Sequence, residues 1–164
     1  MSQNRRTLAR EYAFKFLYHL QLPELKRPKD VLRNKGNPTE LQKLLADFDV
    51  AYREEDPDHP DNVSDPRIRK MALPLIEGTI EHNDEIEKTV ILFLNNWKLK
   101  NIDKVAQTIL YLATFELLFM KDTPVKVVIN EAINLAKKFG QMDSFAFVNG
   151  ILDNIAKSNR GKLT

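Results

Sequence analysis

Hydrophobic residues recur at intervals of three and four along almost the whole chain, and the alternation typical of strands is rare. This spacing predicts helices, which begin near capping residues or prolines and end near prolines or glycines. The predicted helices cover residues 6–22, 39–53, 66–82, 84–97, 103–121, 124–140 and 144–156. We therefore expect an all-α protein of about seven helices.

Two segments interrupt this pattern. Residues 23–37 are basic and loop-like, and residues 54–66 combine three prolines with many acidic residues. The second segment predicts an exposed acidic loop. Asp65 at its end is a suitable N-cap for the next helix, with Pro66 at the first helical position.

The composition excludes several classes of protein. The chain has 164 residues and no cysteine, which excludes disulfide scaffolds, iron–sulfur clusters and cysteine nucleophiles. Its three histidines, at positions 19, 59 and 82, lack the spacing of a metal site. Phosphate-binding glycine loops and the common hydrolase motifs are absent. We expect no cofactor, no metal and no enzymatic activity.

The chain carries no secretion or membrane signal. It lacks the apolar stretch of a signal peptide at its start, and its longest nearly apolar run, residues 109–120, is too short to span a bilayer. We therefore expect a cytoplasmic protein that does not contact membranes.

Charge is unevenly distributed along the chain. Residues 1–35 carry nine Lys and Arg against three Asp and Glu, whereas residues 36–66 carry two against nine. A basic segment of this kind suggests an anionic partner such as nucleic acid, although most basic segments are only solvated surface.

The first predicted helix has the most informative face. Arg10 and Lys15 lie opposite its apolar stripe, and Phe14 and Tyr18 interrupt this basic face. Basic side chains hold phosphates and aromatic rings stack on bases in single-stranded nucleic-acid sites. The alternative is that Phe14 and Tyr18 simply pack against the acidic loop or the second helix.

The last predicted helix carries a second aromatic candidate. Phe147 lies at the margin of its apolar stripe, near the loop that precedes the helix, and could be another stacking ring. Gly150 is unfavourable inside a helix, so we expect a neighbouring helix to pack closely there.

Two blocks of sequence resemble the NusB family of transcription antitermination factors. The first is RRTLAREYAFKFLYHLQL at 5–22. The second is ILYLATFELLFMKDTPVKVVINEAINLAKKFGQMDSFAFVNGILDNIA at 109–156. The resemblance implies two small packed helical bundles, at about 1–82 and 83–157, that form a single RNA-binding domain. It also implies binding of boxA RNA from ribosomal operons together with NusE, a small-subunit ribosomal protein, in a complex on RNA polymerase.

The resemblance also implies roles for individual residues. It assigns RNA contacts to the first and last helices, at Arg5, Arg6, Arg10, Tyr18, Asp143, Ser144 and Phe147, beside the Phe14 and Lys15 of the basic face. It places Lys100, Ala106 and Tyr111 on the surface that faces NusE. Asp143 is an anion next to the expected phosphate path, so it could cap its helix rather than assist binding.

Two other functions fit the same features. One is a helical protein-interaction module, such as a homodimer that hides its RNA face, since some members of this family self-associate. The other is a targeting domain like the NusB-like segment of RNA methyltransferases, which the lack of a cofactor-binding half disfavours.

Overall fold

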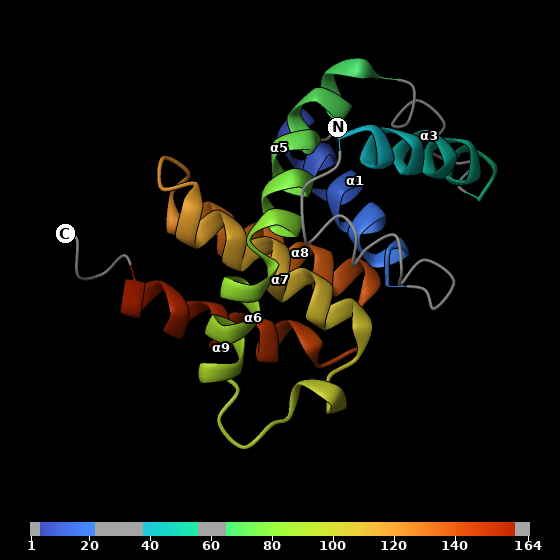
Figure 1. Ribbon diagram of the computed structural model, residues 1–164. Helices are drawn as coiled ribbons and strands as arrows, with labels where there is room; N and C mark the ends of the chain where they lie inside the picture. The colour runs from blue at the N-terminus through green and yellow to red at the C-terminus, as the bar shows by residue number, and fades with distance from the viewer. Residues whose placement is uncertain (1–3, 22–37, 56–64, 160–164) are drawn as a thin grey trace. The chain divides into compact units, whose positions relative to one another are not determined.

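The computed structural model describes residues 4–21, 38–55 and 65–159, and the described residues form helices without any strand (Figure 1). The all-α prediction is confirmed. The chain divides into two compact units, Met1–Glu81 and His82–Thr164. The α-helices are α1 (Arg5–His19), α3 (Pro38–Glu55), α5 (Pro66–Glu81), α6 (Asn83–Leu92), α7 (Lys104–Phe119), α8 (Val125–Phe139) and α9 (Ser144–Asn159).

In the first unit, α1 packs along α5 and also contacts α3. The ring of Phe48 on α3 lies within 5.4–5.6 Å, centroid to centroid, of the rings of Tyr12, Phe16 and His19 on α1. Next to it, the buried Asp49 accepts hydrogen bonds from the Tyr12 hydroxyl and from Arg69 on α5. This carboxylate therefore links α1, α3 and α5, the helices that the structure describes in this unit.

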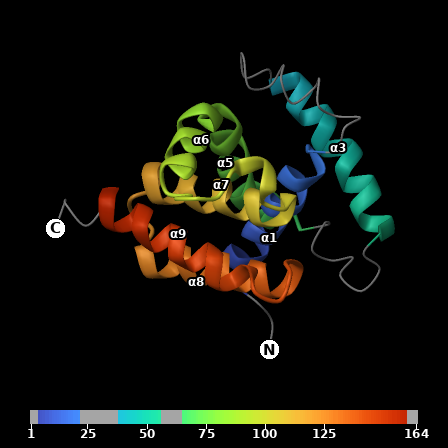
Figure 2. The ribbon, with the colours of Figure 1, turned by 90° about the horizontal axis from the view of Figure 1, so that it is seen from below.

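In the second unit, α7 is the central helix. It packs against α6, α8 and α9, and α8 and α9 lie along each other (Figure 2). Most of the residues of α7 are buried, because it has neighbours on several sides. The largest side chains of this core include Leu110, Leu112, Leu117, Leu152 and Ile155.

Capping side chains fix the starts of two helices where the sequence predicts them. An Asp65 carboxylate oxygen accepts the backbone N–H of Arg67 at 2.9 Å, and Asp103 accepts that of Ala106 at 2.8 Å. Both bonds satisfy N–H groups that have no partner inside the helix. The predicted cap at Asp65 is confirmed, and the structure shows that Asp103 caps α7.

The prediction of where the fourth helix ends is wrong. The pattern predicts a helix as far as Trp97, whereas α6 ends at Leu92 and a short 3₁₀ helix, η2 (Leu99–Asn101), follows. Asn95 adopts a left-handed backbone conformation with φ of 57°. Asparagine tolerates this conformation better than most residues. A residue in the left-handed conformation cannot continue a right-handed α-helix. The chain therefore turns here, and Leu94 is buried.

The expectation for Gly150 is also wrong. A Cβ atom at Gly150 would meet no atom within 4 Å, so no neighbouring helix requires a glycine there. The close approach occurs instead at Gly140, where a Cβ would lie 2.7 Å from the carbonyl oxygen of Ala136. Gly140 thus allows the tight connection between α8 and α9.

Candidate nucleic-acid interface

The N-terminal end of α1 presents two arginines to solvent. Asn4 caps this helix, since its side-chain oxygen accepts the Thr7 N–H at 2.8 Å. Arg5 and Arg6 follow in the first turn, both exposed, and this turn contains no acidic residue. Cations at a helix N-terminus oppose the helix dipole, so an anion bound next to them would remove an unfavourable interaction.

The remainder of the predicted basic face is less open than the helical period suggests. Arg10 exposes only 7% of its surface, and Phe14 is buried, so the prediction of an exposed face is wrong at both positions. Lys15 is partly buried, and its ammonium lies 3.5 Å from a carboxylate oxygen of the buried Glu11. Helix α1 is buried around most of its circumference, which a single helical period cannot reveal.

Tyr18 differs from its neighbours, because it exposes 39% of its surface. Its ring stacks on that of Phe14, with centroids 6.1 Å apart and an angle of 24° between the planes. Phe14 is therefore a packed residue that supports the exposed ring of Tyr18 from one side. The acidic loop of the alternative interpretation lies mostly outside the described residues.

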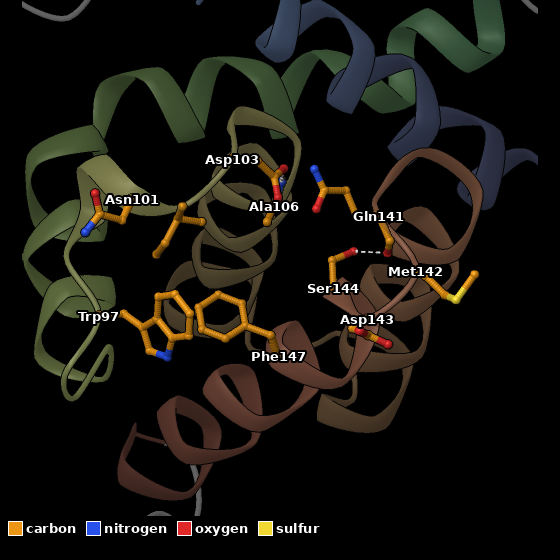
Figure 3. Close-up of a pocket in the computed structure, with 10 residues that line it drawn as sticks. Trp97, Asn101, Asp103, Ala106, Gln141, Met142, Asp143, Ser144 and Phe147 are labelled. Carbon is orange, nitrogen blue, oxygen red and sulfur yellow. Dashed lines mark hydrogen bonds between the residues drawn. The ribbon is translucent and has the colours of Figure 1, made fainter.

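The second unit contains a pocket of about 430 Å³ (Figure 3). One part of its wall comes from the segment after α6 and the start of α7. The other part comes from the connection between α8 and α9 and from the first turn of α9. The lining residues are Trp97, Asn101, Ile102, Asp103, Ala106, Gln141, Met142, Asp143, Ser144 and Phe147.

Two aromatic rings meet in this pocket. Trp97 and Phe147 are arranged edge to face, with centroids 5.7 Å apart and planes at 69° (Figure 3). Trp97 exposes 58% of its surface, and Phe147 is partly buried. Sequence reasoning did not identify Trp97 as a site residue, because nothing local places it opposite a ring fifty positions later.

Polar groups lie around the rings. The Ser144 hydroxyl donates to the carbonyl oxygen of Gln141 at 2.9 Å, which fixes the start of α9 (Figure 3). Asp143 and Met142 are exposed and point away from the ring pair. The structure places Ser144 and Phe147 in the lining of one pocket, with the Asp143 carboxylate at its outer edge.

The three residues expected to face NusE differ in how far they are exposed to solvent. Lys100 is exposed on η2, Ala106 is buried in the pocket wall, and Tyr111 is buried in the middle of α7. Tyr111 offers little surface to a partner, because α7 is surrounded by three other helices.

The described residues contain neither a metal-binding group nor a membrane-spanning helix. Among them, no group of three or more His, Asp or Glu side chains is arranged to hold a metal ion. None of their helices is long and apolar enough to cross a membrane.

Comparison with known proteins gives a consistent result. The family model described as "NusB family" matches residues 7–157. A transcription antitermination protein NusB from Thermodesulfovibrio yellowstonii is 35% identical over 93% of this chain and 92% of its own length. The corresponding protein of Treponema pallidum is 51% identical over 51% of this chain and 60% of its own length. The solved structure of T. maritima NusB matches with a TM-score of 0.69 and 32% identity, over 99% of this chain and 97% of that chain.

Proposed function

Because this chain belongs to the NusB family and is a transcription antitermination factor, we propose that it binds boxA-type single-stranded RNA together with NusE. It would act in this way in the transcription of ribosomal RNA, within an antitermination complex on RNA polymerase. The binding is non-catalytic and uses contacts from each of the two units.

The observation that carries the proposal is the ring pair in the pocket of the second unit. Unpaired bases are recognised by stacking on aromatic side chains, and Trp97 and Phe147 offer two rings in one cavity. The volume of about 430 Å³ falls within the range of about 300–1,000 Å³ typical of small-ligand pockets. An unpaired nucleotide is a ligand of suitable size and chemistry.

The polar lining supports the same ligand. Asn101 and Gln141 carry amides, which both donate and accept hydrogen bonds, and Ser144 carries a hydroxyl. Such groups can read the hydrogen-bonding edges of a base that has left its helical stack. A purely apolar partner would offer no hydrogen bonds to the side-chain amides of Asn101 and Gln141, which disfavours such a partner.

The first unit supplies the electrostatic part of the proposal. The exposed Arg5 and Arg6 bind phosphates, and the exposed ring of Tyr18 stacks on a base. Arg10 and Lys15 lie along the same helix, with Arg10 buried and Lys15 close to Glu11. We assign the main phosphate contacts of this unit to the two leading arginines.

The single tryptophan of the chain provides a direct test. Trp97 lines the pocket, so its fluorescence reports whether a base enters there. We expect a boxA-like RNA to quench this emission and a scrambled RNA of equal length to do so only at higher concentration. Anisotropy of labelled RNA, with and without NusE, measures the affinity in parallel. Equal affinity for both RNAs in both conditions would reject the proposal.

A matched pair of variants separates the pocket from general effects. Phe147→Leu removes a pocket ring, whereas Phe119→Leu removes an exposed ring of the same unit whose centroid lies 4.0 Å from that of His82. Stacking contributes about 1–3 kcal/mol per base, so the first variant should bind at least about fivefold more weakly. The second should bind as the wild type does. Dimerisation unaffected by RNA, seen by light scattering, would instead favour a protein-interaction module.

A further inference from the structure

A second exposed ring lies on α9, away from the pocket. Phe145 exposes 38% of its surface and does not line the cavity that contains Phe147. Two positions along an α-helix correspond to a rotation of about 200°, so the side chains of these two residues leave nearly opposite sides of α9. Phe145 is therefore a separate feature, on the side of α9 that faces α8.

A lysine from α8 covers this ring. The ammonium of Lys137 lies 5.1 Å from the centroid of the Phe145 ring, which is a cation–π contact. Lys137 is exposed in the last turn of α8. At an exposed site such a contact is weak, so a ligand that offers better partners to both groups can displace it.

Lys137 also belongs to a polar stripe on α8. Lys126, Asn130, Asn134 and Lys137 are all exposed and follow each other at intervals of four, four and three residues. These intervals place them on one stripe of the helix, with a lysine at each end and amides between. None of these four residues is acidic, so the stripe attracts the negatively charged backbone of a nucleic acid.

We propose that Phe145 and Lys137 form a second nucleotide subsite, where a base stacks on the Phe145 ring and the adjacent phosphate pairs with the Lys137 ammonium. The inference rests on the proposed function, because it assigns this subsite to the same single-stranded RNA that enters the pocket. The α8 stripe then carries the RNA backbone from Lys137 towards Lys126. When RNA binds, the Lys137 ammonium leaves the Phe145 ring. The ring then stacks on a base, and the ammonium pairs with a phosphate.

The subsite can be given its own fluorescent reporter. In a double variant, Trp97→Phe with Phe145→Trp, the only indole lies at the subsite, and a ring remains in the pocket. We expect boxA-like RNA to quench this indole over the same concentration range in which anisotropy detects binding. Binding without quenching would overturn the subsite while leaving the proposed function intact. Quenching by NusE alone would overturn it in favour of a protein contact.

Single substitutions separate stacking from charge. Phe145→Ala should weaken RNA binding at least about fivefold without changing its salt dependence, and Phe145→Tyr should restore it. Lys137→Met should lower the slope of log affinity against log salt by about 0.7, the value for one phosphate of a single strand. Lys88→Met, at an exposed position of α6, is the matched control and should leave the slope unchanged.

These outcomes also distinguish the subsite from a contact that only holds α8 and α9 together. In that case Phe145→Ala would lower the melting temperature, and Lys137→Met would leave the salt slope as it is. If the wild type fails to bind boxA-like RNA and Trp97 is not quenched, the proposed function and the subsite are both rejected.

Discussion

The two leading arginines of α1 give the sharpest quantitative prediction. Arg5 and Arg6 are exposed in a first turn without acidic residues, so each is placed to contact one phosphate. Each contact to single-stranded nucleic acid contributes about 0.7 to the slope of log affinity against log salt. The double variant Arg5→Gln/Arg6→Gln should therefore lower this slope by about 1.4.

The difference in slope corresponds to a large and measurable change in affinity. Between 50 and 200 mM salt, the affinity of the wild type should fall about sevenfold more than that of the double variant. Anisotropy of a labelled boxA-like RNA, titrated at four or five salt concentrations, resolves such a difference. Glutamine keeps much of the side-chain length and removes only the charge, so loss of packing contributes little.

Arg67 is the matched control. It is exposed in the first turn of α5, at a position like that of the two arginines, but its guanidinium lies 3.2 Å from a carboxylate oxygen of Asp65. Arg67→Gln should leave the slope unchanged. An equal decrease in this variant would show that the slope reports general positive charge, and an unchanged slope in the double variant would refute the phosphate contacts.

Arg10 provides a contrast on the same helix. Because it is buried and interacts within the protein, we expect Arg10→Gln to lower the free energy of unfolding rather than the salt slope. Urea unfolding followed by circular dichroism, together with the same salt titration, measures both quantities. A lower slope at unchanged stability would show that this guanidinium reaches phosphate despite its burial.

Three further predictions follow from single contacts. Asp143→Asn should tighten RNA binding severalfold at low salt, because it removes an anion at the edge of the pocket; weaker binding would show that the carboxylate contacts the RNA directly. Tyr12→Phe should destabilise the first unit by about 1.5–3 kcal/mol in urea unfolding, since a buried carboxylate, Asp49, loses a donor. Arg67 donates to Asp65 through its side chain and backbone and holds the pKa of that carboxyl below its ordinary value. This stabilisation is present above the unfolded pKa and is lost as pH falls through the folded one, so Asp65→Asn should lower the melting temperature at neutral pH and not in strong acid.

The helices themselves follow largely from local sequence. The starts of α5 and α7 are set by Asp65 and Asp103, whose carboxylates bond to the next free N–H groups. A cap is a contact between residues two or three positions apart, so the sequence contains all the information it needs. The predicted cap and proline at 65–66 also agree with the observed start of α5 at Pro66.

Burial is a different matter, because it depends on how many neighbours a helix acquires. The helical period identifies the apolar stripe of α1, but it predicts that Arg10, Glu11 and Phe14 are exposed like any residue on the opposite side. In the structure all three are buried, and only Tyr18 among the predicted aromatic contacts of this helix is well exposed. A pattern can rank the faces of a helix, but it cannot state whether a second face is also covered.

The pocket depends on the early end of α6, which the periodic pattern does not predict. A helix that continued to Trp97 would fix its ring on the surface of α6. Because α6 ends at Leu92 and Asn95 adopts a left-handed conformation, Trp97 lies in the connection that leads to α7, where its ring meets Phe147. The early end of α6 is thus what allows Trp97 to take part in the two-ring site. Local conflict between pattern and structure is expected where a chain builds a site, since a binding surface needs side chains that a regular helix would direct elsewhere.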